Sequence, residues 1–141
     1  MKDDLILRVV AKLLIPFLVL FALYVQFHGD FGPGGGFQAG TILAAAVVFH
    51  ALVFGLDATR AQVPERLVES MMAAGVLIYA GVGFASLLLG GKFLDYNLLA
   101  HDPIHGQHRG IFWVELGVAI TVAGVMLKIF YMFADRGRLD E

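Results

Sequence analysis

Four long apolar stretches constrain this chain more than any other feature of its sequence. They run over about residues 5–27, 36–56, 70–90 and 111–134. Each approaches or meets the roughly 20 residues that a helix needs to cross the ~30 Å apolar core of a bilayer. The third stretch has no charged side chain, and the second has only His50 as an ionisable group. The pattern predicts an all-α integral membrane protein with four transmembrane helices.

The composition agrees with this fold class and excludes several functions. Of 141 residues, 59% are hydrophobic and 16% charged, against roughly 45–50% and about 25% in soluble domains. The formal charge is −2 and the basic residues are scattered, so nucleic-acid binding is not expected. The absence of cysteine excludes disulfides and thiolate metal sites. Because the connections are short, we expect one domain over residues 1–141, without a separate soluble catalytic domain.

The distribution of basic residues predicts the orientation in the membrane. Eight of them lie in or beside the N-terminal segment, the loop between the second and third stretches, and the C-terminal tail: Lys2, Arg8, Lys12, Arg60, Arg66, Lys128, Arg136 and Arg138. Two lie on the opposite side, Lys92 and Arg109. By the positive-inside rule, both termini are expected in the cytoplasm.

Small residues recur four positions apart within the apolar stretches. The pairs include Gly36 with Gly40, Ala51 with Gly55, and Gly117 with Thr121. Such spacing lets membrane helices approach closely, within this chain or with other subunits. The alternative is that small residues simply fill the helices.

A glycine-rich turn separates the first two stretches, with six glycines among residues 29–40. Gly34 to Gly36 free the backbone for unusual conformations, while Pro33 stiffens the entry. The N-terminus of the following helix could hold an anion, the side chain of Asp30, or a partner's carboxylate. The alternative is a plain tight hairpin. Nucleotide binding is not expected, because the lysine of a P-loop and a preceding strand are both missing.

Two ionisable residues lie in the fourth stretch. A charged group inside a membrane is costly, so each is a candidate functional residue. Glu115 is expected roughly 7 Å inside its helix, if that helix begins just after Gly110. It is a candidate to bind a proton or cation, the alternative being a salt bridge with Arg109 or a neighbouring subunit. Lys128 is a second candidate for the ion path, the alternative being a side chain that snorkels to the inner surface.

The remaining ion-path candidates are His28, Asp30, His50 and Asp57. His50 could relay protons, or it could be a packed polar group. Asp57 could receive a proton from the cytoplasm, or be a solvated charge near Arg60. A bis-histidine haem site is not expected, because His28 and His50 lie at different depths.

The loop over residues 91–110 is rich in histidine. Its possible metal ligands are His101, Asp102, His105 and His108. We expect Pro103 and Gly106 to break any helix that would align His101 with His105, so neither a metal site nor a cofactor is predicted. We expect the loop to pack against a partner, with Tyr96 and Trp113 as aromatic anchors.

The turn also carries a family resemblance. It contains a proline, three glycines and a phenylalanine in succession, followed by another glycine: Pro33, Gly34, Gly35, Gly36, Phe37 and Gly40. With four spans and an extended loop before the last one, the chain resembles the MnhB-type subunit of the Mrp family of multisubunit Na⁺/H⁺ antiporters. The resemblance covers essentially the whole chain.

The resemblance implies a small, non-catalytic, multi-pass subunit in the cell membrane of a prokaryote. Its implied partners are other antiporter subunits, including large ones that resemble the proton-pumping subunits of complex I. Na⁺ and H⁺ would be transported ions rather than cofactors, and the turn residues would serve assembly. The resemblance gives no transport role to Glu115, Lys128, His50 or Asp57. The alternative function is an ion-translocating or scaffold subunit of a hydrogenase-like or complex I-related membrane oxidoreductase.

Overall fold

The structure is a computed structural model that describes residues 5–29 and 34–139. These residues form helices and no strand: α1 (Leu5–His28), α2 (Gly36–Phe54), α3 (Leu56–Gln62), α4 (Glu65–Leu88), the 3₁₀ helix η1 (Tyr96–Leu99) and α5 (Pro103–Leu139). The four long helices are each long and apolar enough to cross a membrane. The predicted all-α fold with four spans is therefore confirmed.

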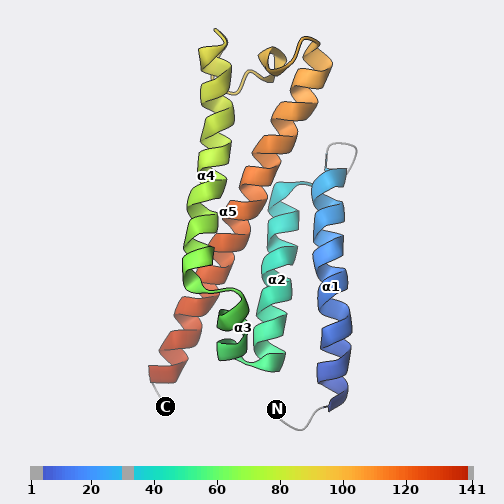
Figure 1. Ribbon diagram of the computed structural model, residues 1–141, viewed down its shortest axis with the longest axis vertical. Coiled ribbons are helices and arrows are strands. Elements are labelled where there is room, and N and C mark those ends of the chain that lie inside the picture. The colour runs from blue at the N-terminus through green and yellow to red at the C-terminus, as the bar shows by residue number, and fades with distance from the viewer. Residues whose placement is uncertain (1–4, 30–33, 140–141) are drawn as a thin grey trace.

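The long helices form two hairpins, α1–α2 and α4–α5, that meet along α5 (Figure 1). Helix α5 packs on both α4 and α2, and α1 packs chiefly on α2. The α4–α5 hairpin extends beyond the α1–α2 turn at the end that carries η1, so this turn meets α5 partway along its length (Figure 1). The beginning of α1, the short α3 and the end of α5 share the opposite end. Its cytoplasmic location remains a prediction.

Two small clusters of buried side chains hold the helices together. Val25, Ala39 and Ala119 join α1, α2 and α5 near the glycine-rich turn. Toward the other end, Val68 and Tyr131 lie in a cluster that joins α2, α4 and α5. Alanine makes up most of the first cluster, with Ala39 and Ala119, because small side chains let membrane helices approach closely.

The predicted close contacts at small residues are confirmed at Gly40 and Gly117. A Cβ at Gly40 would lie 2.5 Å from the carbonyl oxygen of Ala119, and one at Gly117 would lie 2.8 Å from that of Gly75. Gly55 differs, because nothing lies within 4 Å of its Cβ position. Its φ of 97° instead ends α2 at Phe54, where the second span was expected to continue to about residue 56.

The first span is close to its prediction, and Pro16 lies inside α1 without ending it. The other two spans begin earlier than expected. Helix α4 begins at Glu65, directly after Pro64, and the preceding loop contains α3. Helix α5 begins at Pro103 rather than at about residue 111.

The expectation that Pro103 and Gly106 break any helix aligning His101 with His105 is therefore right at Pro103, because α5 begins there and leaves His101 outside, and wrong at Gly106, which lies within α5. Proline fits the first position of a helix, where its missing N–H leaves no bond unmade. The carboxylate of Asp102 caps this end by accepting the N–H of Ile104 at 3.3 Å. Gly106 lies against the carbonyl of Tyr96, where a side chain would clash.

Candidate functional site

The α1–α2 turn meets α5 through backbone rather than side chains. A Cβ at Gly36 would overlap the carbonyl oxygen of Glu115, and one at Gly40 would crowd that of Ala119. Only glycine lets the first turns of α2 lie this close to α5. We call this contact, formed by Gly29, Gly35, Gly36 and Gly40 against residues 115–119, the glycine junction.

The carboxylate of Glu115 lies within the glycine junction. Cβ atoms at Gly35 and Gly29 would lie 3.0 Å from Oε1 and 2.8 Å from Oε2 of Glu115 respectively. Gly35 has a φ of 122°, a conformation that favours glycine, and its N–H donates to the carbonyl of Val25 at 3.3 Å. The carboxylate thus lies at the N-terminal end of α2, where the helix dipole favours a negative charge.

The N-terminus of α2 was expected to be able to hold an anion, Asp30 or a partner's carboxylate. The carboxylate that lies there is that of Glu115, from this chain. Two residues singled out there, Asp30 and Pro33, lie outside the described residues. The expected depth of Glu115 is wrong because α5 begins at Pro103. Glu115 is twelve positions after Pro103, so it lies about 18 Å along its helix.

A buried amide beside the glycine junction was missed from the sequence. Gln26 is 5% exposed, and within residues 5–29 and 34–139 neither its Nε2 nor its Oε1 has a hydrogen-bond partner. It follows Val25, whose carbonyl binds the turn. An amide in an otherwise apolar segment directly before the turn was the available signal, because such a group is costly to bury unpaired.

Near the turn, the described residues of α1 and α2 form an open apolar groove. Phe37 is 65% exposed, and with Phe21, Thr41 and Ile42 it lines a groove of about 420 Å³. His28, at the end of α1, stacks on Tyr24 with ring centroids 5.2 Å apart. Phe37 thus faces outward, whereas His28 is half-buried at the end of α1.

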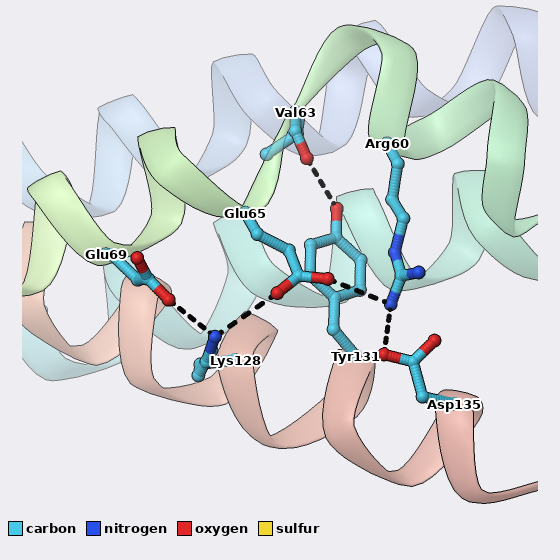
Figure 2. A network of polar contacts seen from close by, with 7 residues as sticks. All are labelled: Arg60, Val63, Glu65, Glu69, Lys128, Tyr131 and Asp135. Carbon is cyan, nitrogen blue, oxygen red and sulfur yellow. Dashed lines mark hydrogen bonds and ion pairs between the residues drawn. The ribbon is translucent and has the colours of Figure 1, made fainter.

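At the opposite end, five charged residues form a continuous chain of ion pairs (Figure 2). We call it the charge network. Arg60 of α3 contacts Asp135 at 2.7 Å and Glu65 at 3.2 Å. Lys128 of α5 contacts the other oxygen of Glu65 at 3.2 Å and Glu69 at 2.6 Å. The network ties the α3–α4 corner to the last turns of α5.

Tyr131 lies under the charge network and is fully buried. Its hydroxyl donates to the carbonyl of Val63 at 2.9 Å, and Arg60 lies over its ring, 5.1 Å from the centroid (Figure 2). The hydrogen bond to Asp135 raises the pKa of Arg60, against the lowering effect of partial burial. Arg60 therefore stays charged at every physiological pH.

The sequence interpretation missed this network, although it noted Lys128 and Arg60. Glu65 and Glu69 are four residues apart, so they share one face of a helix. Two carboxylates on one helix face could have indicated a basic side chain on a neighbouring helix. Because Lys128 is paired with both, its contacts indicate a structural role. Asp57 lies exposed in the first turn of α3.

His50 lies near the same end, away from Glu115. Its Nδ1 is 2.7 Å from Oγ1 of Thr59, and its Nε2 is 3.4 Å from Nε2 of Gln62. The structure thus brings Glu115 to the glycine turn, Lys128 to the charge network and His50 to α3, at three separate places.

In the histidine-rich loop, His105 pairs with Asp102. Nδ1 of His105 lies 2.8 Å from the carboxylate of Asp102, and this hydrogen bond, with the one from Ile104, lowers the pKa of Asp102. His101 lies before α5, whereas His105 and His108 lie on it. The part of the chain that the structure describes contains no cluster of three or more potential metal ligands. Tyr96 packs within this chain, its ring against Gly110, while Trp113 is 49% exposed.

Comparison with known proteins identifies the family of this chain. Residues 6–128 match the family described as a domain related to the MnhB subunit of Na⁺/H⁺ antiporter. The chain is also 31% identical over 131 residues to a Staphylococcus haemolyticus protein whose name describes it as antiporter subunit mnhB2. A Staphylococcus aureus (strain Newman) protein of the same name is equally similar. Each alignment covers 91% of this chain and 92% of the relative. The family match includes the glycine junction and extends along α5 to Lys128. The chain belongs to this MnhB-related family.

Proposed function

We propose that this chain is a membrane subunit of a multisubunit Na⁺/H⁺ antiporter in a prokaryotic plasma membrane. The observation that carries the proposal is the match over nine-tenths of the chain to proteins described as antiporter subunits, in a fold of four membrane-length helices. No observation favours the alternative of an oxidoreductase subunit.

The subunit acts as part of the transporter rather than as a catalyst. Na⁺ and H⁺ are its transported ions and no resident cofactor is assigned. Its partners are the other subunits of the antiporter, the large complex I-like ones among them.

The exposed apolar surface supports a role in assembly. In its most apolar window, 11% of the residues of α1 are buried, against 33% in α2. Helix α1 therefore presents most of its side chains to lipid or to neighbouring subunits. The exposed Phe37 beside it extends this surface to the turn. We assign assembly contacts to Phe37 and to the turn that the glycine junction holds in place.

Glu115 is the residue of this chain that we assign to the ion path. Its carboxylate belongs to a membrane-length helix and lies beside Gly29 and Gly35. Carboxylate oxygens can bind either a proton or a hard cation. Lys128 is paired with two glutamates, and His28 is stacked on Tyr24 at the end of α1, so neither has comparable support.

Proton exchange in everted membrane vesicles tests the proposal. Vesicles from cells that express the complete set of antiporter subunits should release a preformed pH gradient when Na⁺ is added. Vesicles that lack only this chain should not. Unchanged exchange without this chain would contradict the proposal.

Glu115→Gln tests the assignment to the ion path. The amide keeps the size of the side chain but binds neither a proton nor a cation as a carboxylate does. We expect lower exchange and an altered pH profile. Glu69→Gln, the same substitution in the charge network, is the matched control and should leave the profile unchanged. A profile that Glu115→Gln does not alter would make this residue structural.

A further inference from the structure

A cavity enters the bundle between α1, α2 and α3, beside His50. Its larger part, about 380 Å³, is lined by Lys12, Pro16, Phe54 and Ala58 together with Ile15, His50 and Gln62. A deeper part, about 90 Å³, also contacts Ile15, His50 and Gln62, and reaches Thr59. His50 therefore stands where the two parts adjoin, and each part has room for at least one water molecule.

The contacts of His50 fit a single neutral form of the ring. The Nε2 group of Gln62 can only donate, so Nε2 of His50 must accept from it. Nδ1 then carries the proton and donates to Thr59 Oγ1 at 2.7 Å. The Thr59 hydroxyl in turn donates to the carbonyl of Gly55 at 3.0 Å. The three bonds run in one direction, and Nε2 is the only ring atom left to take up a proton.

The walls of the cavity favour water over a metal cation. Lys12 and Gln62 are exposed polar residues at its rim. Pro16 has no N–H to donate to the carbonyl of Lys12, four residues earlier, which leaves that oxygen in need of a partner. Among the described lining residues there is no carboxylate, the ligand that hard cations prefer.

The charges around His50 are also positive rather than negative. From α1, Lys12 lines the cavity, and Arg8 lies over the ring of Phe54, 5.6 Å from its centroid. From α3, Arg60 is turned to the charge network, and Asp57 is not among the lining residues. These positive charges disfavour a sodium ion in the cavity.

We propose that this cavity is an aqueous vestibule, open at the α3 end of the bundle, in which Nε2 of His50 exchanges protons with water. A hydronium ion in the cavity gives its proton to the lone pair of Nε2 and is left as water, and the amide of Gln62 turns to present Oε1 to the new N–H. Return of the proton to water restores the starting bonds. The inference rests on the proposed membrane location but not on antiport activity.

The lack of native cysteine allows a direct test of water access in the assembled complex. Single cysteines are introduced in place of Gln62 at the rim of the cavity and of His50 where its two parts adjoin. A third replaces Val47, which lines the deeper part. Ala45→Cys, on the exposed apolar side of α2, and Val53→Cys, buried and outside both parts, are the controls. The probe is a membrane-impermeant maleimide added to sealed vesicles of either orientation.

Cysteines at positions 62 and 50 should react more than about tenfold faster than the controls, because maleimide needs the hydrated thiolate. They should do so only when the α3 end faces the reagent. Position 47 should react at an intermediate rate. Reaction at position 50 as slow as at positions 45 and 53 in both orientations would overturn the vestibule, and would indicate a cavity filled by lipid or a partner.

The second arm uses the native histidine and does not depend on a cysteine variant. Nitrogen NMR of ¹⁵N-histidine-labelled complex in bilayers, with His50→Gln to assign the signal, should show neutral His50 protonated at Nδ1. Thr59→Val should shift the neutral ring toward protonation at Nε2, whereas Thr41→Val, whose hydroxyl bonds within its own helix, should not. Protonation at Nε2 in the native protein would overturn the proposed relay.

The outcomes separate this inference from the proposed function. If the labelling rates and the His50 tautomer are as expected but Na⁺/H⁺ exchange does not need this chain, the antiporter role alone is contradicted. Exchange that requires this chain, with an unreactive position 50, would contradict the vestibule alone.

Discussion

Helix α5 meets its neighbours in two opposite ways. At the glycine junction, Gly36 and Gly40 lie directly against the backbone of α5, and a single added carbon at Gly36 would overlap the carbonyl of Glu115. At the charge network, long side chains such as Arg60 and Lys128 bridge the gap, and each has two partners. The first contact has no spare room, whereas the second has redundant bonds. We therefore expect single substitutions to damage the glycine junction far more.

The surroundings of the two contacts strengthen this difference. Close packing in a membrane depends on direct contact, because lipid tails are as apolar as the side chains that they would replace. The charge network is partly hydrated, with Glu69 at 55% side-chain exposure, and exposed ion pairs contribute little to stability.

The largest effect is expected for Gly36→Ala. The added Cβ must push α2 away from α5, and overpacking of this kind costs about 1–3 kcal/mol. Gly81→Ala and Gly137→Ala are the controls, because nothing lies within 4 Å of either Cβ position. The measurement is the thermal stability of the detergent-solubilised complex. If the complex with Gly36→Ala has the same melting temperature as the complexes with the control variants, α2 and α5 are not in backbone contact at Gly36.

Tyr131→Phe should have the next largest effect. It removes the hydroxyl that donates to the carbonyl of Val63 and leaves this acceptor unpaired, at a cost of about 1 kcal/mol. The ring remains in place for Arg60 and the core. Chemical denaturation of native and variant protein measures the difference. Tyr79→Phe, at a side chain that is 38% exposed, is the matched control and should be near neutral.

Glu65→Gln should have a smaller effect that depends on salt. It weakens the contacts of Glu65 with both Arg60 and Lys128, so it should lower the free energy of unfolding more than Asp135→Asn does. The difference between the two variants should be less than about 1 kcal/mol. At about 1 M salt, screening of the charges should make the stabilities of the two variants nearly equal. A loss as large as that of Gly36→Ala, or one that salt does not change, would mean that the network is not hydrated.

The smallest effect is expected at the start of α5, and it should depend on pH. The hydrogen bond with His105 lowers the pKa of Asp102. The stabilisation is therefore complete above the ordinary carboxyl pKa and is lost as the pH falls through the lowered value. Exchange of the Gly106 amide, which bonds the carbonyl of Asp102 at 2.9 Å, should accelerate over that range relative to its unstructured rate. Asp102→Asn should remove this dependence; its persistence would assign the titration to another group.

Much of the fold could be predicted from the sequence because hydropathy and backbone chemistry are local properties. The four spans follow from runs of apolar residues, and the close contact at Gly36 and Gly40 follows from glycine spacing. The start of α5 was misjudged because proline and glycine were treated as helix breakers, although proline suits a first position and Gly106 makes room for η1.

The candidate site was less predictable, because its contacts join distant segments. Arg60 and Asp135 are 75 positions apart, and Lys128 and Glu65 are 63 apart. Glu115 was recognised as unusual from its depth in an apolar stretch. Its place beside Gly29 and Gly35 depends on the offset between the two hairpins, which no local pattern encodes.

Complementation of cells that lack this chain tests the central claim most directly, with Na⁺-driven release of a pH gradient in everted vesicles as the readout. Native chain and the two control glycine variants should restore exchange, and Gly36→Ala should restore little of it even when the protein reaches the membrane. Full exchange with Gly36→Ala, or native exchange with no copy of the chain, would contradict an antiporter subunit that depends on its glycine junction.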